Sequence, residues 1–203
     1  QVINCVLRFH PASAEPYVAY QNFEVNVAAD ISMRKFTGGA WEYVGDPVIS
    51  PLILTNDHLA FEFNPLNTNT PIVYYAKDNS PHQVVELNGT TWEPKPGLGN
   101  YLINRNLGFG FDVSPLGNPV LAFSDQGCTF GPNGTGHLSA VGHNGTSWAN
   151  LSNPCFSANP ATISDLEYNK LTGELMAYHK GGQEISQFEF QRMLIKYSVS
   201  QWD

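Results

Sequence analysis

The chain has 203 residues, of which 42% are hydrophobic and 14% charged, and its formal net charge is −8. This length suits one well-buried domain or two small ones, and no apolar run approaches the ~20 residues of a membrane-spanning helix. Only ten Lys and Arg stand against eighteen Asp and Glu, so nucleic acid and anionic membranes are poor partners, because clustered cations bind both. The 18 glycines and 14 prolines favour short strands and turns over long helices.

Segments with strict polar–apolar alternation begin each of four similar stretches of the chain. They read LRFH (7–10), FEFN (61–64), FDVS (111–114) and LEYN (166–169). A period of two predicts a strand with one polar and one apolar face. An apolar block follows each time: PYVAY (16–20), PIVYY (71–75), PVLAF (119–123) and ELMAY (174–178). A continuous apolar block predicts a strand buried on both faces.

Two further strands complete each stretch. The third is predicted at 31–36, 82–87, 137–143 and 193–197, and a short turn (TGG, NGT, NGT or SVS) leads into the fourth. The fourth strand carries Trp41, Trp92, Trp148 and Trp202 in turn. Asn-Gly favours a tight hairpin, because both central residues of a type I′ turn need positive φ. The recurrence of tryptophan at one strand position indicates packing rather than sugar stacking.

Four antiparallel four-stranded units of roughly 50 residues are typical of β-propeller blades. We therefore predict an all-β, four-bladed β-propeller in one domain, 1–203, with approximate blades at 1–45, 46–97, 98–152 and 153–203. No strand is left over to close the ring, so part of a larger propeller is the alternative. Over its full length the sequence resembles the secreted propeller proteins whose repeats read PYVAY…NGTSW, which implies the same fold.

Four Asn-X-Ser/Thr patterns predict N-glycosylation, at Asn88, Asn133, Asn144 and Asn150. They favour a mature secreted, extracellular chain whose leader has been removed, with Gln1 as the new terminus. The alternative is that Asn-Gly simply makes good turns.

The three cysteines leave one without a partner. Cys128 and Cys155 flank a Gly/Asn-rich insertion, and an oxidising compartment would allow a disulfide between them. Such a bridge would stabilise the fold by ~3–4 kcal/mol. Cys5 lies in an apolar stretch and is predicted to be a buried free thiol.

The first strand of each propeller blade lines the axial channel. Its apolar face is expected to pack between blades, with Leu7, Phe9, Phe61, Phe63, Phe111, Val113, Leu166 and Tyr168. Its opposite face would place Arg8, Glu62, Asp112 and Glu167 in one layer around the axis. Converging carboxylates repel one another, so Arg8, water or a Ca²⁺ ion held by Glu62, Asp112 and Glu167 must offset them. No other cofactor is expected, and no His/Cys cluster has zinc spacing.

Polar loops are predicted to gather at one end of the propeller, at 21–30, 77–82, 124–136 and 179–187. Their amides and aromatic rings suit sugars, and the candidate ligand-binding residues are Asn22, Phe23, Asp78, His82, Asp125, Phe130, His179 and Gln183. Ordinary solvated loops are the alternative at each position.

The sequence shows no nucleophile elbow, P-loop or dinucleotide motif. The function expected first is therefore a non-enzymatic, lectin-like binding protein whose partners are glycans or other extracellular glycoproteins. A structural extracellular glycoprotein that associates with itself through exposed blade edges or loops comes second. A glycoside-active enzyme comes third, with Asp112 and Glu167 as its carboxylate pair.

Overall fold

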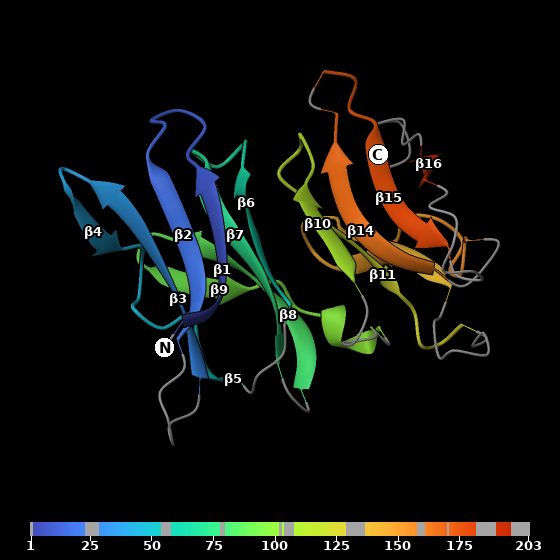
Figure 1. The fold of residues 1–203 in the computed structure, drawn as a ribbon, viewed down its shortest axis with the longest axis horizontal. Coiled ribbons are helices and arrows are strands. Elements are labelled where there is room, and N and C mark those ends of the chain that lie inside the picture. Colours follow the sequence, from blue (N-terminus) through green and yellow to red (C-terminus); the bar gives the residue numbers. More distant parts are fainter. Residues whose placement is uncertain are drawn as a thin grey trace. The chain divides into compact units, whose positions relative to one another are not determined.

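The structure is a computed structural model that describes residues 2–22, 29–53, 58–77, 80–101, 103, 108–128, 137–157, 161–169, 171–181 and 190–195. Within these ranges the chain is all-β apart from one 3₁₀ turn, η1 (Leu98–Asn100). No helix in them has the length and hydropathy to cross a membrane. The chain divides into two compact units, 1–99 and 100–203 (Figure 1).

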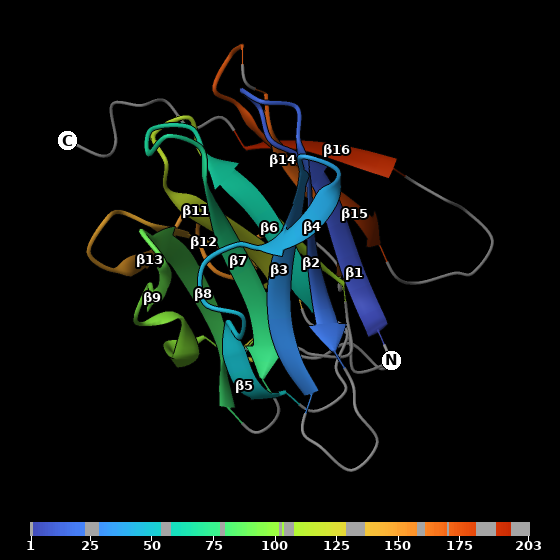
Figure 2. The ribbon, with the colours of Figure 1, turned by 90° about the vertical axis from the view of Figure 1, so that its left-hand side faces the viewer.

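The first unit contains two antiparallel sheets in which consecutive strands are neighbours. The first sheet comprises β1 (Val2–Phe9), β2 (Pro16–Asn22), β3 (Ala29–Thr37) and β4 (Ala40–Tyr43), with β5 (Ser50–Ile53) paired to β3 as a strand that the sequence pattern did not predict (Figure 2). The second sheet comprises β6 (Leu59–Asn64), β7 (Thr70–Lys77), β8 (Ser80–Asn88) and β9 (Thr91–Pro94).

The second unit repeats the plan. One sheet comprises β10 (Phe109–Val113), β11 (Pro119–Ser124), β12 (Leu138–His143) and β13 (Trp148–Asn150). The other comprises β14 (Ala161–Tyr168), β15 (Leu175–Gly181) and β16 (Phe190–Ile195), and its predicted fourth strand, at Trp202, lies outside the described residues. The predicted all-β fold and antiparallel four-stranded sheets are confirmed, whereas closure as a four-bladed ring in one domain stays a prediction.

Strand register corrects the alignment of the fourth apolar block. Phe9 pairs with Pro16, and Tyr168 pairs with Leu175 in the equivalent position. Glu174 instead belongs to the turn, because its carbonyl accepts the Asn169 amide at 2.8 Å. The sequence comparison that aligned Glu174 with Pro16 is therefore wrong by one residue.

The Asn-Gly-Thr hairpin is confirmed between β8 and β9, but its predicted turn type is wrong. Asn88 pairs with Thr91, so Gly89 and Thr90 are the central residues. Only Gly89 has positive φ, at 63°. Positive φ at the first central residue alone is the pattern of a type II′ turn, which also matches strand twist.

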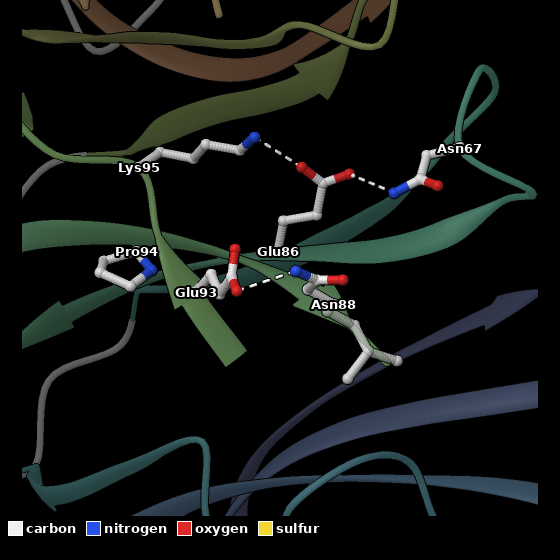
Figure 3. A pocket seen from close by; sticks show the side chains of 7 residues that line it. Asn67, Glu86, Asn88, Glu93, Pro94 and Lys95 are labelled. Atoms are coloured by element: carbon white, nitrogen blue, oxygen red, sulfur yellow. Dashed lines mark hydrogen bonds and ion pairs between the residues drawn. The ribbon is translucent and has the colours of Figure 1, made fainter. Parts of the chain in front are cut away.

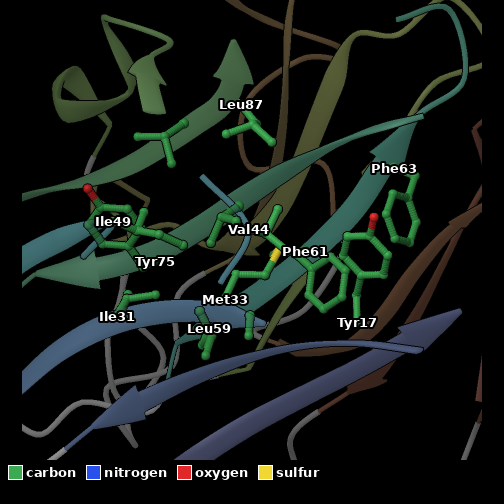
Figure 4. Close-up of a cluster of buried hydrophobic side chains, with 13 residues drawn as sticks. Tyr17, Ile31, Met33, Val44, Ile49, Leu59, Phe61, Phe63, Tyr75 and Leu87 are labelled. Carbon is green, nitrogen blue, oxygen red and sulfur yellow. The ribbon is translucent and has the colours of Figure 1, made fainter. Parts of the chain in front are cut away.

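The core of the first unit lies between its two sheets (Figure 4). It is built from β2 and β3 on one side and from β6, β7 and β8 on the other, with Tyr17, Ala19, Ile31, Met33, Val44, Ile49, Leu59, Phe61, Phe63, Val73, Tyr75, Val85 and Leu87. In the second unit a matching cluster contains Val120, Ala122, Leu138, Ala140, Leu151, Leu166, Tyr168, Leu175 and Ala177. Alternation along the strands thus correctly predicted most buried positions.

Two strand positions depart from this pattern. Leu7 and Phe9 were expected to pack between blades, but they are 51% and 63% exposed. They face away from the core of the first unit, because their neighbours in the chain, Val6 and Arg8, point to the side that packs on the second sheet. The predicted burial of Leu7 and Phe9 is therefore wrong.

The predicted disulfide joins Cys128 and Cys155, whose Cα atoms lie 5.8 Å apart. A structural disulfide indicates an extracellular or otherwise oxidising environment. Cys5 is a free thiol as predicted, but it is exposed rather than buried.

Candidate functional site

A polar cavity of about 230 Å³ lies beside the hairpin formed by β8 and β9 (Figure 3). Its lining consists of Asn67, Glu86, Leu87, Asn88, Glu93, Pro94 and Lys95. The hairpin register pairs Glu86 directly with Glu93. Side chains of directly paired residues lie on the same face of a sheet, so the two-residue turn places both carboxylates on one side of the sheet.

Glu86 is held by donors on several sides. Its Oε2 contacts Lys95 Nζ at 2.5 Å, and its Oε1 accepts hydrogen bonds from Asn64 Nδ2 at 2.6 Å and from Thr70 Oγ1 at 3.3 Å. Burial raises the pKa of Glu86, but the hydrogen bonds from Lys95 and Asn64 and the charge of Lys95 outweigh it. The net effect is a pKa below the ordinary value of 4.5, so Glu86 is ionised at neutral pH.

Glu93 has a different environment. Glu93 is exposed to solvent, and its Oε1 accepts one hydrogen bond, from Asn88 Nδ2 at 2.8 Å. Figure 3 shows this contact beside the separate contacts of Glu86 with Lys95 and Asn67. The cavity therefore has one carboxylate fixed by surrounding donors and a second that is open to solvent.

Two carboxylates in unlike environments can divide the roles of base or nucleophile and of proton donor. The side chains of Asn67, Asn88 and Lys95 add hydrogen-bond donors to the same lining. Because a hydroxyl-rich ligand both donates and accepts hydrogen bonds, carboxylates and amides together suit its recognition.

Sequence reasoning missed this site, although the sequence contains a signal for it. Glu86 and Glu93 stand symmetrically about the predicted Asn-Gly-Thr turn, each two residues from its paired ends, Asn88 and Thr91. In a two-residue hairpin such positions pair directly. The hydrogen bond from Asn64 to Glu86 could not be predicted in this way, because Asn64 lies on a different strand, β6, and only the folded structure brings the two side chains together.

The predicted axial layer draws on both units, with Arg8 and Glu62 in the first and Asp112 and Glu167 in the second. In the first unit Arg8 Nε contacts Glu62 Oε1 at 2.6 Å, so an arginine offsets the carboxylate there. Among the described residues, no group of three His, Cys, Asp or Glu side chains is placed to hold a metal ion. A Ca²⁺ ion held by Glu62, Asp112 and Glu167 stays a prediction.

In the second unit, Asp112 is buried and its carboxylate accepts backbone hydrogen bonds. The donors are the amides of Val113 at 2.7 Å and Tyr168 at 2.5 Å, one to each oxygen. Glu167 is exposed on the neighbouring strand. Because backbone amides engage both oxygens of Asp112, we do not retain Asp112 and Glu167 as an acid–base pair.

The predicted loop residues occupy varied places. His82 is not in an exposed loop: it lies in β8, is 6% exposed, and its Nδ1 is 2.7 Å from Tyr74 Oη. Asp125 holds its own turn, with Oδ1 accepting the Gly127 amide and Oδ2 accepting Ser139 Oγ. The remaining positions do not form a described site.

Those remaining positions divide into two sets. Asn22 ends β2 and is half-buried, and His179 lies in β15 rather than in a loop. Phe23, Asp78, Phe130 and Gln183 lie outside the described residues.

Three predicted glycosylation positions, Asn88, Asn144 and Asn150, are exposed, and Asn133 lies outside the described ranges. The Asn144 side chain also closes its own turn, because Oδ1 accepts the amides of Thr146 and Ser147. Exposure makes these positions accessible to modification.

No protein-family model matches the chain, and no curated protein matches it. Among solved structures, a GH43 β-1,3-galactosidase with galactodeoxynojirimycin is similar, with a TM-score of 0.55 and 9% identity over 97% of this chain and 74% of that chain. The neighbour is a five-bladed β-propeller. This likeness identifies the fold of the present chain as β-propeller-type.

The neighbour also corrects the functional expectation. The sequence pattern favoured a non-enzymatic, lectin-like protein, whereas the similar structure is a glycoside hydrolase. That expectation is therefore corrected, because the similar structure is that of an enzyme.

Proposed function

We propose that this chain hydrolyses glycosidic bonds and that Glu86 and Glu93 are its catalytic carboxylates. The observation that carries the proposal is their direct pairing across β8 and β9 in one cavity. The likeness to a galactosidase fold supports the same class of reaction.

The unlike environments of the two carboxylates suggest their roles. Glu86, kept ionised by Lys95 and Asn64, would attack the anomeric carbon and form a glycosyl ester as the glycosidic bond breaks. Glu93 would donate its proton to the leaving oxygen. It would then take a proton from the water that hydrolyses the ester, which frees Glu86 and returns Glu93 to its acid form.

The proposed roles also imply the stereochemistry. A mechanism in which Glu86 forms a glycosyl ester is that of the retaining enzymes, because two successive displacements at the anomeric carbon restore its original configuration. We therefore propose retention of the anomeric configuration.

The size of the cavity suggests a small portion of a glycan as its ligand. Its volume of about 230 Å³ is below the ~300–1,000 Å³ typical of drug-sized sites. A terminal sugar residue fits these dimensions better than an internal stretch of polysaccharide.

The finer fold and the cellular setting belong to the same proposal. We propose that the four sheets are successive blades of one propeller, whether of four blades or more. Secretion and N-glycosylation at Asn144 and Asn150 accord with the disulfide and with the exposure of both side chains. A glycan on Asn88 would obstruct the cavity that Asn88 lines, so the proposed activity requires that position to be unmodified.

The test is hydrolysis of a panel of aryl glycosides and oligosaccharides by the wild type and by Glu86→Gln and Glu93→Gln. Each substitution is expected to lower kcat/KM about 10²–10⁴-fold. Glu42→Gln, an exposed carboxylate on β4, is the control and should retain full activity. Unchanged activity in Glu86→Gln, or no hydrolysis of any substrate by the wild type, would contradict the proposal.

Covalent trapping gives a second readout. A 2-deoxy-2-fluoro glycoside of a sugar that the wild type hydrolyses should label the peptide that contains Glu86. Label on a different carboxylate would refute the role of Glu86 while leaving glycoside hydrolysis itself intact.

A further inference from the structure

Two Asn-Gly-Thr turns of this chain have the same sequence but different surroundings. One turn, at 88–90, joins β8 to β9, and the other, at 144–146, joins β12 to β13. Asn88, Gly89, Asn144 and Gly145 are all exposed, and a Cβ added to either glycine would meet no atom within 4 Å. Any difference in the chemistry of the two turns must therefore come from their hydrogen bonds.

Asn-Gly is a pair of residues at which asparagine deamidates readily, because glycine has no side chain to hinder the approach of its own backbone nitrogen. That nitrogen attacks the asparagine Cγ, and the new bond closes a succinimide ring. The bond from Cγ to Nδ2 breaks, and the glycine N–H proton leaves with Nδ2 as ammonia. Water then opens the ring to an aspartyl or an isoaspartyl residue. The reaction needs a glycine N–H that can lose its proton and an asparagine side chain that can turn toward it.

The turn at Asn88 holds these two groups weakly. In the part of the chain that the structure describes, no group accepts a hydrogen bond from the Gly89 amide. The Asn88 side chain donates one hydrogen bond, from Nδ2 to Glu93 Oε1 at 2.8 Å (Figure 3). This one exposed bond is all that must break before the side chain can turn toward Gly89.

The turn at Asn144 holds the same two groups firmly. The Gly145 amide donates to His143 Nδ1 at 3.1 Å, and His143 is buried. Asn144 Oδ1 accepts the amides of Thr146 at 3.0 Å and Ser147 at 2.9 Å. Three hydrogen bonds must therefore break before the Gly145 nitrogen can attack, and each can slow the reaction by up to about tenfold.

We propose that Asn88 is a site of spontaneous deamidation and that Asn144 is protected from the same reaction. The fold selects between the two sites, because both have the sequence Asn-Gly-Thr and both are exposed. The difference in hydrogen bonding makes deamidation at Asn88 about tenfold or more faster than at Asn144.

Deamidation at position 88 alters the cavity that contains Glu86 and Glu93. It removes the Nδ2 donor that contacts Glu93 and places a carboxylate beside it, and the two negative charges repel each other. The isoaspartyl product also adds a methylene group to the main chain at the turn, which disturbs the register that pairs Glu86 with Glu93. The resulting loss of activity rests on the proposed function, whereas the modification itself does not.

The test is peptide mass spectrometry of the full chain after ageing in mildly alkaline buffer. The protein is produced in a host that attaches no N-glycans, because a glycan on Asn88 would be bonded to Nδ2, the atom that leaves. The exchange of NH₂ for OH is measured separately in the peptides that contain Asn88 and Asn144, and enzymatic methyl transfer detects isoaspartate. The product should accumulate about tenfold or more faster at Asn88.

The unfolded chain supplies the matched control. In urea with a reducing agent the two Asn-Gly-Thr sites lose their hydrogen bonds, so their rates should become equal. His143→Ala frees the Gly145 amide and should accelerate deamidation at Asn144 while leaving the rate at Asn88 unchanged. Circular dichroism checks that this variant is folded, and the wild-type comparison decides the proposal if it is not.

Two results would overturn the proposal. Equal rates at Asn88 and Asn144 in the folded protein would show that the hydrogen bonds give no protection. A faster reaction at Asn144 would mean that His143 acts as a base toward the Gly145 amide instead of protecting it.

Activity measurements on the aged protein separate this proposal from the proposed function. The kcat/KM for glycoside hydrolysis should fall in proportion to the fraction modified at position 88 and should not follow modification at position 144. A wild type without hydrolytic activity would overturn the proposed glycosidase alone, because the mass measurement does not depend on activity.

Discussion

Asp112 Oδ2 accepts the backbone amide of Tyr168 at 2.5 Å, although 56 positions separate the two residues in the chain. The bond joins β10 to β14 and therefore ties two sheets of the second unit together. Asp112 is buried, so loss of its acceptors would leave backbone donors unsatisfied in the core.

Asp112→Ala is therefore expected to destabilise the protein by about 2–3 kcal/mol, because the amides of Val113 and Tyr168 lose a charged acceptor. Asp112→Asn should have a smaller effect, since its amide oxygen retains one of the two acceptor positions. Urea unfolding followed by circular dichroism measures both. Equal stability of Asp112→Ala and the wild type would show that the bond contributes nothing.

Acid sensitivity should depend on Glu86. Its pKa is lowered in the folded state from 4.5, so the stabilisation from its ionised form is fully present above the unfolded value. That stabilisation is lost as the pH falls through the lower, folded value. The free energy of unfolding of Glu86→Gln should therefore be below that of the wild type near neutral pH and approach it in acid.

A partner variant tests the cause. Lys95→Met removes the cation that contacts Glu86, so the pH at which stability is lost should move upward. Urea unfolding over a series of pH values measures the shift. An acid transition that stays in place in Lys95→Met would show that Lys95 does not set the pKa of Glu86.

The disulfide should stabilise the second unit. Cys128 and Cys155 are separated by 27 positions, and a loop of that length corresponds to about 3–4 kcal/mol. Cys128→Ser with Cys155→Ser should lower the free energy of unfolding by that amount under oxidising conditions. Cys5→Ser, which leaves the bridge intact, is the control, and an effect as large as that of the double variant would be inconsistent with this assignment.

Gly110 on β10 is expected to be intolerant of any side chain. A Cβ at this position would lie 2.8 Å from the backbone nitrogen of Leu166 and 3.0 Å from the carbonyl carbon of Asp165. Backbone cannot move aside cheaply, so Gly110→Ala should destabilise the protein by about 1–3 kcal/mol. Gly142→Ala is the matched strand variant, because its Cβ meets only the Leu151 side chain, and thermal unfolding should show the smaller loss for it.

The sequence was sufficient to predict the described strands other than β5, because alternation and hairpin signals are local. Phe61 and Phe63 were correctly placed in the core by their period of two, and Trp92 by its position after the turn. The same pattern failed for Leu7 and Phe9, because whether a face is covered depends on a neighbouring sheet and not on the strand itself. The fourth apolar block was misaligned by one residue because the sequence ELMAY resembles PYVAY when the two are compared letter by letter. The strand pairing, in contrast, begins at Leu175, after the turn that contains Glu174.

The candidate site was harder to predict than the fold. Glu86 and Glu93 are ordinary strand residues in the sequence, and only their hairpin register makes them a pair. Asp112 and Glu167 were predicted as a carboxylate pair because they recur at one position in the repeat. In the structure Asp112 instead accepts a hydrogen bond from the backbone amide of Tyr168. Repetition therefore predicted architecture better than chemistry.

The edge of β3 that faces away from β2 pairs with two different short strands. Along its second half, from Arg34 to Thr37, it pairs with β4, and near its start, at Ala29 and Ile31, it pairs with β5. Exposed strand edges are templates for fibrillar growth. Because two short segments divide this edge between them, few of its backbone groups are left to recruit an incoming chain, so amyloid-like extension from β3 is disfavoured.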